Sequence, residues 1–348
     1  MKKLIVCCFF ICYSLQATYN TIEEYTLNPT VSEQCNTLLH TLPFDPYTQW
    51  DFYKLFAKNL MLRMLPTDVI ASITAMRNGN GPDVIVIHNA PVDEYIPPTP
   101  IDGKVLKAGT QFNPMAKGFV SETTLLGICS MLDAYPQATM TLQANSPLSY
   151  IHQIIPLDDE QSKKSRSSTG SRVAFEPHTE AVSLEPAIKF FELLGIRGNK
   201  NVATDLFLLA DILNFIKLHL PTGKTYEWLM GELRKPQFIM RDGSDWAHVS
   251  HEQVLPIISY TAHGERIFRF NANGIRVEGD NKTAQDIVDY LIKTLQNPAF
   301  KKQCVKKFYL QKGDLLIFNN WRVMHARDSF TADPYNRRWL QRCYCISN

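Results

Sequence analysis

Two histidines, one glutamate and two arginines in this chain are of the types that could bind a metal ion together with an acidic ligand. His178-Thr-Glu180 lies near the middle of the sequence, and His325 lies close to its end, followed by Arg338 and Arg342. Two imidazoles and one carboxylate can bind one face of a divalent iron ion and leave the opposite face open for chemistry. A nearby arginine can hold the acid group of a co-substrate through paired hydrogen bonds. The set therefore indicates a non-haem iron centre.

The His-x-Glu triplet is weak evidence on its own. The chain has 9 histidines and 34 acidic residues among 348 residues, so about one His-x-acid triplet is expected by chance. Indeed, His263-Gly-Glu265 has the same pattern. The surroundings of each triplet must separate a metal site from a polar pair on the surface.

The residues before His178 and His325 have the pattern of β-strands. An extended segment from Val173 to Glu180 would place His178 and Glu180 on one side and Thr179 on the other. His325 follows a Gly-Asp turn and an apolar run of strand character within residues 311–320. Both histidines are thus expected on a β scaffold.

Polar and apolar residues alternate in the segment 337–345. If this segment is a strand, Arg338, Leu340 and Arg342 share one face, and both guanidinium groups face the same cavity. Inward-facing guanidinium groups need anions, and a carboxylate is a suitable partner. Without the histidines, a solvated basic strand face would be the simpler interpretation.

Composition and periodicity indicate one large domain over residues 21–348, without an internal repeat or linker. The 36 basic and 34 acidic residues leave a net charge of +2, which gives no reason to expect a nucleic-acid partner. The apolar run 203–219 is expected to hold a short extended segment at Thr204 and then a helix from Asp205 to Leu218. Strands are expected in most of the remainder, and further helices around residues 47–78, 119–134 and 282–297.

Together these segments resemble the clavaminate synthase-like group of iron(II)/2-oxoglutarate-dependent dioxygenases, within the taurine-dioxygenase-like superfamily. The resemblance is carried by Asp83–Asp93 with Pro97–Pro100, Ile151–Pro156, Phe175–Glu180, Leu193–Gly198 with Ala203 and Thr204, and Gly313 through Arg342. It implies an α+β fold with a double-stranded β-helix (jelly-roll) core and flanking helices. It also implies a hydroxylase of the arginine/asparagine oxygenase type. Such an enzyme uses Fe(2+), 2-oxoglutarate and O2 on an unactivated carbon of a small molecule, here a free or carrier-bound L-amino acid.

The same resemblance implies roles for the metal and co-substrate residues. His178, Glu180 and His325 would bind the iron and carry the catalysis. Arg338 would pair with the distal carboxylate of 2-oxoglutarate, and Thr204 would hydrogen-bond to the same molecule.

Substrate contacts are implied at five further positions. Arg342 would meet the carboxylate of an amino-acid substrate, and Gln153 and Ser168 fall where polar contacts to the substrate lie. Where arginine-hydroxylating relatives place aspartates, this chain has Asn271 and Asn273, whose amides hold a cation less well than a carboxylate does. We therefore expect a neutral rather than a cationic substrate side chain. An ordinary turn with the following glycine explains these two asparagines equally well.

The N-terminus leaves the compartment open. Residues 1–20 form a signal peptide or an N-terminal extension, since Met1-Lys-Lys precedes an apolar run that is too short to span a bilayer. Iron(II) and 2-oxoglutarate are intracellular, which favours the cytoplasm, whereas the leader favours export. Outside the leader five cysteines remain, and their spacing indicates neither a disulfide framework nor a zinc site. In particular, Cys343 and Cys345 have no third metal-binding partner visible in the sequence.

Two other functions fit part of the pattern. A zinc hydrolase would explain His178, Glu180 and His325, but it would not explain the paired arginines, and the chain lacks a helical His-Glu-x-x-His motif. A non-catalytic binding protein on the same β scaffold is disfavoured by the intact ligand set.

Overall fold

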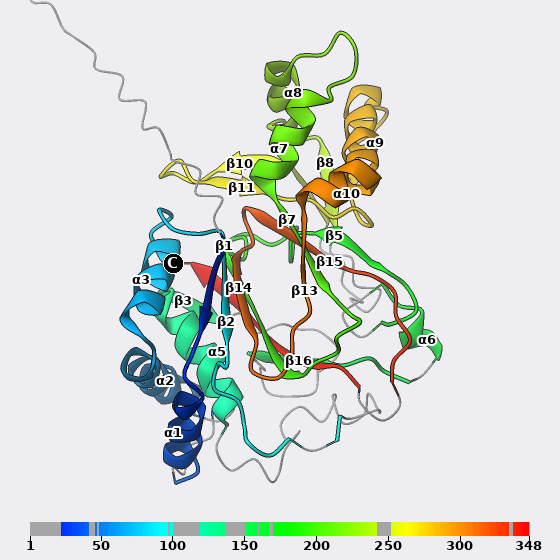
Figure 1. The fold of residues 1–348 in the computed structure, drawn as a ribbon. Helices are drawn as coiled ribbons and strands as arrows, with labels where there is room; N and C mark the ends of the chain where they lie inside the picture. Colours follow the sequence, from blue (N-terminus) through cyan, green and yellow to red (C-terminus); the bar gives the residue numbers. More distant parts are fainter. Residues whose placement is uncertain are drawn as a thin grey trace, which may run out of the picture.

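The computed structural model contains both helices and strands, and it describes residues 22–41, 46, 49–96, 98–99, 119–136, 150–158, 160–166, 170–241, 252–333 and 337–347. The candidate signal peptide and Ser168 lie outside the described residues. Two sheets form the centre of the fold, and helices pack on their outer sides (Figure 1). None of the helices in the described ranges is long and apolar enough to cross a membrane.

The larger sheet has seven strands in the order β1-β2-β14-β6-β16-β3, with β4 also paired to β16. Only β1 and β2 are parallel among these pairs of described strands. The strands are β1 (Ile22–Thr26), β2 (Val84–His88), β3 (Ala134–Pro136), β4 (Ile151–Ile154), β6 (Phe190–Arg197), β14 (Leu315–Asn319) and β16 (Trp339–Ser347).

The smaller sheet is antiparallel, with the order β13-β7-β15-β5. Its strands are β5 (Phe175–His178), β7 (Thr204–Leu208), β13 (Val305–Phe308) and β15 (Val323–Arg327). The two sheets pack against each other, because one cluster of buried side chains joins Leu316 of β14 and Leu340 of β16 to Leu206 of β7 and Val323 of β15.

Four helices cover the outer face of the larger sheet (Figure 1): α1 (Pro29–Leu39), α2 (Trp50–Met64), α3 (Thr67–Arg77) and α5 (Val120–Met131). Successive residues of β14 alternate between the two sides, with Ile317 in the helix-side core and Leu316 and Phe318 in the core between the sheets. Residues 315–318 of this strand are all apolar because both faces of the sheet are covered.

A second group of helices and two small sheets packs around the smaller sheet. Its apolar core includes Phe207 of β7 and Met324 of β15, which point away from the larger sheet. The elements are α7 (Leu209–Leu218), α8 (Tyr226–Leu233), α9 (Lys282–Gln296), α10 (Pro298–Cys304), β8 (Phe238–Arg241), β9 (Glu252–Leu255), β10 (Ile258–Tyr260), β11 (Arg266–Phe268) and β12 (Arg276–Val277).

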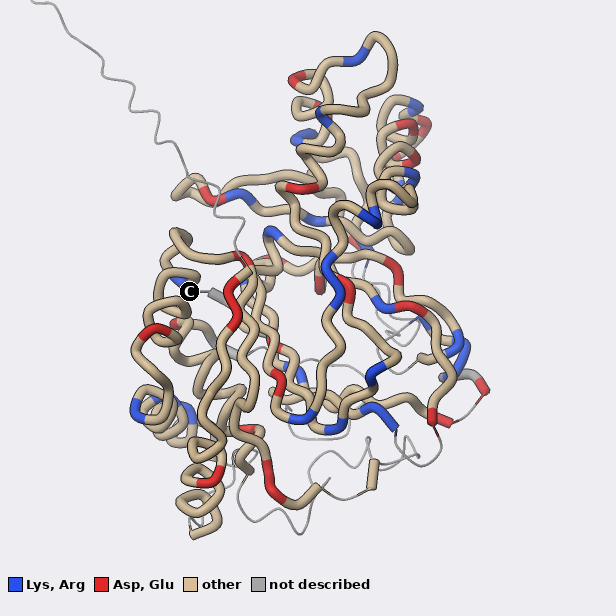
Figure 2. Tube along the Cα trace, viewed as in Figure 1, with Lys and Arg blue, Asp and Glu red and all other residues tan. Residues whose placement is uncertain are grey.

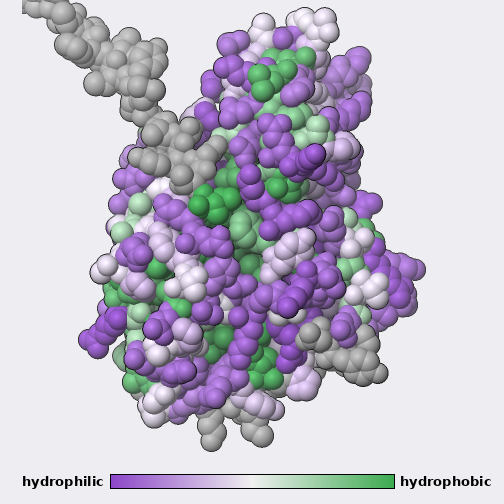
Figure 3. Space-filling view, viewed as in Figure 1, coloured by the Kyte–Doolittle hydropathy of each residue, from purple (hydrophilic) through white to green (hydrophobic). Residues whose placement is uncertain are grey.

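The surface is predominantly polar on the face seen in Figure 3, with apolar residues in separate small areas. Helix α9 illustrates how the chain achieves this. It buries Ile287 and Leu291, while residues of both charges, among them Lys282 and Asp286, line its outer side (Figure 2). A short helix, α6 (Glu160–Lys163), lies in the segment between β4 and β5.

The helices expected over 119–134 and 282–297 are present as α5 and α9, whereas three other expectations need correction. The segment 47–78 forms two helices, α2 and α3, because Pro66 interrupts it. The strands expected elsewhere are replaced by helices at α1, α8 and α10. Finally, the segment after Thr204 is strand β7 up to Leu208, since its backbone pairs with strands on both sides, and helix α7 begins only at Leu209.

Candidate metal and co-substrate site

The two candidate histidines face each other across adjacent strands. His178 ends β5 and is the register partner of His325 on β15, with 4.2 Å between the ring centroids. The Nδ1 of His178 donates a hydrogen bond to the carbonyl oxygen of Glu176 at 2.7 Å, since a carbonyl can only accept. This bond fixes the tautomer and leaves the lone pair of His178 Nε2 available as a ligand.

Glu180 completes the group from the turn that follows β5, so the extended conformation expected from the sequence ends before it. Its backbone N–H donates to Asn320 Oδ1 at 2.8 Å, and the Asn320 amide donates back to the Glu180 carbonyl at 3.2 Å. The Tyr344 hydroxyl donates to Glu180 Oε1 at 2.6 Å. The other carboxylate oxygen, Oε2, lies 3.6 Å from Nε2 of each histidine.

These three side chains fit a divalent iron ion. Their ligand atoms all lie within 4.8 Å of one another. Among the described residues, His178 Nε2 and Glu180 Oε2 are buried without a hydrogen-bond partner. Buried polar atoms are rarely left without one, so a missing ligand is the natural explanation. Two nitrogens and one carboxylate oxygen are also the donor set of open non-haem iron sites.

The electrostatics of the group favour the metal-binding protonation states. Burial raises the pKa of the Glu180 carboxyl, but Arg342 and the two imidazoles lower it by more, so its pKa lies well below the usual range. Burial and the neighbouring His178 lower the pKa of His325. The glutamate is therefore ionised and His325 neutral near neutral pH.

Aromatic rings form an apolar wall beside the imidazoles. Phe175 lies 4.1 Å from the ring centroid of His178, and Phe191 and Phe318 lie 4.8 and 5.4 Å from that of His325. The sequence analysis did not assign these rings to the site. Their only signal in the sequence is membership in apolar strands, which core residues share.

A second polar region contains two buried guanidinium groups, those of Arg338 and Arg327. Arg338 immediately precedes β16, and its Nη2 donates to Thr204 Oγ1 on β7 at 3.1 Å. Burial and Arg327 lower the pKa of Arg338 to about 9. In the described part of the chain neither arginine forms an ion pair within the site, and Arg327 Nη1 has no hydrogen-bond partner. Such a pair calls for an anion.

Arg327 was missed by the sequence analysis. It lies two positions after His325 on β15, so the period of two along a strand could have found it.

Arg342 lies close to the metal-binding group. Its Nη1 is 3.9 Å from Glu180 Oε2, its Nη2 is 3.2 Å from His152 Nδ1, and its guanidinium carbon lies 4.6 Å from the centre of the Tyr344 ring. Leu340, like Tyr344, belongs to the core between the sheets, as the expected alternation along this strand requires.

Gln153, the expected substrate contact, points away from this group. Its Oε1 accepts a hydrogen bond from the Trp339 indole at 2.8 Å, and Trp339 belongs to the core on the helix side of the larger sheet. The preceding residue on β4, His152, faces Arg342 instead. Gln153 and His152 lie on opposite faces of the strand, so His152 rather than Gln153 faces the group around Glu180.

Asn271 and Asn273 lie in one turn beside the metal-binding strand. Asn271 forms a bridge with His178, its Oδ1 accepts from the Asn273 backbone N–H at 3.0 Å, and its Nδ2 donates to the Arg241 carbonyl at 3.3 Å. The side chain of Asn271 is thus used to shape the turn. This arrangement supports the ordinary-turn interpretation for Asn271.

The second His-x-Glu triplet has a different environment. Glu265 Oε2 pairs with Lys189 at 2.8 Å, while His263 is exposed in the connection between β10 and β11. Within the described ranges, His263 and Glu265 belong to no group of potential metal ligands.

Known proteins match this chain in sequence and in fold. Residues 237–344 match a family model described as taurine catabolism dioxygenase TauD, TfdA family. An L-lysine 4-hydroxylase of Niastella koreensis is 25% identical over 188 residues, which are 53% of this chain and 47% of that protein. The chain thus spans about half the length of the curated relative it matches.

Solved structures extend the likeness to nearly the whole chain. The non-heme iron oxygenase OrfP, in complex with Fe and alpha-ketoglutaric acid, is 18% identical, with a TM-score of 0.73 over 94% of this chain and 95% of that chain. An asparagine oxygenase in complex with Fe(II), 2S,3S-3-hydroxyasparagine and succinate is also 18% identical, with a TM-score of 0.72 over 93% of each chain. The resemblance to the taurine-dioxygenase-like superfamily is therefore confirmed, by the TauD, TfdA family match in residues 237–344 and by a fold shared with these oxygenases.

Proposed function

We propose that this protein is an iron(II)- and 2-oxoglutarate-dependent oxygenase that hydroxylates an unactivated carbon of a free or carrier-bound L-amino acid. The observation that carries the proposal is the buried group of His178, Glu180 and His325, in which ligand atoms without hydrogen-bond partners face one another. Two facing sheets with the site between them also support a double-stranded β-helix core over one domain, residues 21–348.

In this proposal the ligands bind iron through His178 Nε2, Glu180 Oε2 and His325. When bound, the iron and its co-substrates supply the oxidation that no side chain can perform. Asn320 and Tyr344 hold the Glu180 backbone and Oε1, so that Oε2 is directed at the metal.

The co-substrate region accounts for the buried arginines. Arg338 would form a bidentate pair with the distal carboxylate of 2-oxoglutarate, Thr204 would donate a further hydrogen bond, and Arg327 would add positive charge. A zinc hydrolase would leave Arg338 and Arg327 without a ligand.

The substrate region is built around Arg342 and His152, which lie beside Glu180. Arg342 would hold the substrate carboxylate, and His152 takes the place that the sequence analysis gave to Gln153. Ser168 and Asn273 remain candidates for contacts to the rest of the substrate. The names of the similar proteins refer to lysine and asparagine, and one OrfP complex contains (3S)-hydroxy-L-Arg. These support an amino acid, and the missing acidic partner at Asn271 and Asn273 favours a neutral side chain.

For the compartment, the intracellular supply of iron(II) and 2-oxoglutarate favours the cytoplasm, and a cleaved leader within residues 1–20 would instead direct export. N-terminal sequencing of the protein from whole cells and from the medium distinguishes the two.

The decisive experiment adds iron(II) and 2-oxoglutarate to the anaerobic protein. We expect a weak visible charge-transfer band, together with succinate release under air. His178→Ala should abolish both, while His263→Ala in the second triplet should leave both unchanged. A wild-type protein that lacks the band, releases no succinate and retains zinc tightly would refute the proposal. Screening amino acids for stimulated succinate formation then identifies the substrate, and strong turnover of arginine would overturn the preference for a neutral one.

A further inference from the structure

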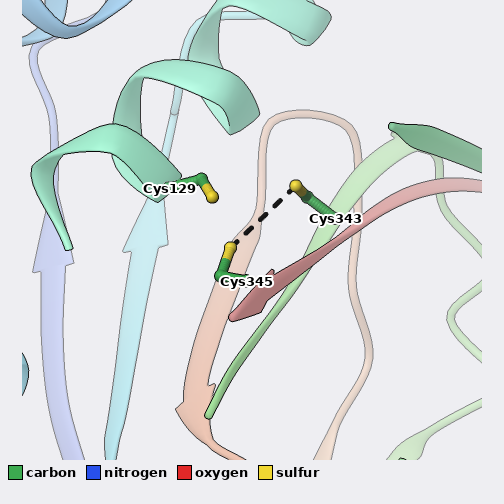
Figure 4. Close-up of side chains that lie close together, drawn as sticks. All are labelled: Cys129, Cys343 and Cys345. Atoms are coloured by element: carbon green, nitrogen blue, oxygen red, sulfur yellow. Dashed lines mark hydrogen bonds between the residues drawn. The ribbon is translucent and has the colours of Figure 1, made fainter. Parts of the chain in front are cut away.

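Three cysteines converge in the core between the helices and the larger sheet, on the side of β16 opposite the candidate iron site. Cys129 lies on α5, and Cys343 and Cys345 lie two positions apart on β16 (Figure 4). All three are fully buried, and their sulfurs lie within 4.8 Å of one another. The fold thus supplies the third partner that could not be seen in the sequence.

A buried carboxylate accompanies the thiols. Glu192 on β6 is the register partner of Cys343, and its Oε1 lies 3.5 Å from Cys345 Sγ. The residue has no exposed surface, and among the described residues its Oε2 has no hydrogen-bond partner. A carboxyl group in an apolar core that is only partly satisfied is costly to bury.

We propose that Cys129, Cys343, Cys345 and Glu192 form a structural zinc site that links α5 to β16 and β6. Thiolates select soft or borderline metals, and three sulfurs with one carboxylate oxygen complete a closed four-coordinate shell. The bound ion would replace the thiol protons, which leave to solvent, and would satisfy the carboxylate. The net charge of such a site equals that of a four-cysteine zinc site.

The separations that involve Cys345 fit tetrahedral zinc, whereas the Glu192 carboxylate lies more than 4.8 Å from at least one of the other two sulfurs and would have to move closer on binding. Zn–S bonds of about 2.3 Å at tetrahedral angles separate two sulfurs by about 3.8 Å, and a Zn–O bond of about 2.0 Å places the oxygen about 3.5 Å from a sulfur. The observed separations are 3.9 Å between the sulfurs of Cys343 and Cys345, and 3.5 Å between Cys345 Sγ and Glu192 Oε1.

A disulfide between the two β16 cysteines is a poor alternative. Residues two positions apart on an extended strand are separated by about 6.7 Å along the strand. The Cβ atoms of two cysteines in a disulfide are only about 3.5–4.5 Å apart. Such a bond would require β16 to buckle where it pairs with β6 and β3. A cluster of neutral thiols beside a protonated Glu192 is the stronger competitor, and the experiment must exclude it.

The test measures metal content in a His178→Ala, His325→Ala background, so that the iron site does not contribute. We expect about one zinc ion per purified chain, as for a closed structural site. Cobalt(II) bound in its place should show intense near-ultraviolet thiolate charge-transfer absorption. Glu192→Gln, which preserves shape, and Cys129→Ser should each lose most of the zinc, whereas Cys35→Ser should retain it, because Cys35 is equally buried but lies outside the cluster.

Two results would overturn the site. One is a zinc-free chain in which all three thiols react freely after denaturation, which identifies a neutral thiol cluster. The other is a disulfide between Cys129 and either β16 cysteine, found by mass spectrometry. If the variants do not fold, zinc release from the double-histidine background on treatment with a thiol-blocking reagent decides the question, because a cysteine-bound ion is released in proportion to the blocked thiols.

Discussion

The two faces of β16 give two buried carboxyl groups opposite electrostatic surroundings within a few residues of the same strand. On the inner face, Arg342 and Tyr344 contact the carboxylate of Glu180, whose pKa is lowered. On the outer face, Cys345 contacts Glu192, the register partner of Cys343, and burial raises the pKa of this glutamate. The comparison shows that equal burial does not decide the state of a carboxyl group. The neighbouring charges decide it.

The largest expected effect concerns Arg338, which precedes β16 and faces the inner side. Arg338→Met should raise the apparent KM for 2-oxoglutarate by about 100-fold, because a bidentate charge-assisted pair contributes about 3 kcal/mol. Arg338→Lys keeps the charge but loses the paired geometry, and should raise KM by about tenfold. Succinate formation at varied co-substrate concentration measures both.

Arg338→Met should not destabilise the protein in the absence of co-substrate. Because Arg338 is a buried cation without an ion pair among the described residues, an apolar side chain of similar length should leave the free energy of unfolding unchanged or increase it. Urea unfolding checks this point. A parallel loss of stability and iron binding would make Arg338 a structural residue.

A matched pair of substitutions compares the two faces of β16 directly. Tyr344→Phe removes the hydrogen bond to Glu180 Oε1 and should weaken iron binding by about 10-fold, with little change in Tm. Trp339→Phe on the outer face removes the donor to Gln153 and should reduce stability by about 1–2 kcal/mol, with iron affinity unchanged. Iron titration and thermal unfolding of both variants test the contrast, and equal effects on both quantities would abolish it.

The smallest expected effect is on the pH dependence of the free energy of unfolding. Burial raises the pKa of Glu192, so the folded, zinc-free protein keeps this proton to higher pH than the unfolded chain does. Its contribution to stability is therefore present below its ordinary pKa and is lost as the pH rises. Glu192→Gln should flatten this fall, because glutamine does not titrate.

Bound zinc should reverse the sign of this pH dependence, so that the free energy of unfolding rises with pH. The zinc-bound state has already released the thiol protons that the unfolded chain still carries, so stability should rise with pH until the free thiols ionise. Denaturant unfolding across pH, with and without a chelator, compares the two forms. The same falling slope in both would mean that zinc does not bind at Glu192.

The sequence predicts the site best where local pattern and chemistry coincide. His178 and His325 are preceded by strand patterns, and the alternation around Arg342 correctly indicates an inward-facing side chain. Glu180 was identified by its type and spacing, although it lies in a turn held by Asn320. That pairing connects residues far apart in the chain, and no local pattern encodes it.

Long-range pairing also explains what the sequence could not supply. Gln153 and His152 differ in which side they face, and only the pairing of β4 with β16 fixes that choice. The sequence of strand β7 was predicted to be part of a helix, because its run of apolar residues fits a helix as well as a strand. Its pairing with β13 and β15 makes it a strand. Cys129 joins Cys343 and Cys345 through the packing of α5 on the larger sheet, and Glu192 approaches them through the pairing of β6 with β16.

The position of β16 within the larger sheet has a consequence for biosynthesis. The strand lies between β6 and both β3 and β4, although it is the last strand along the described chain. A ribosome delivers the N-terminal strands first, so β6 must wait with one edge unpaired until residues beyond Trp339 have emerged. The order of synthesis therefore places Arg342 and Tyr344 beside Glu180 only after most of the chain has been made.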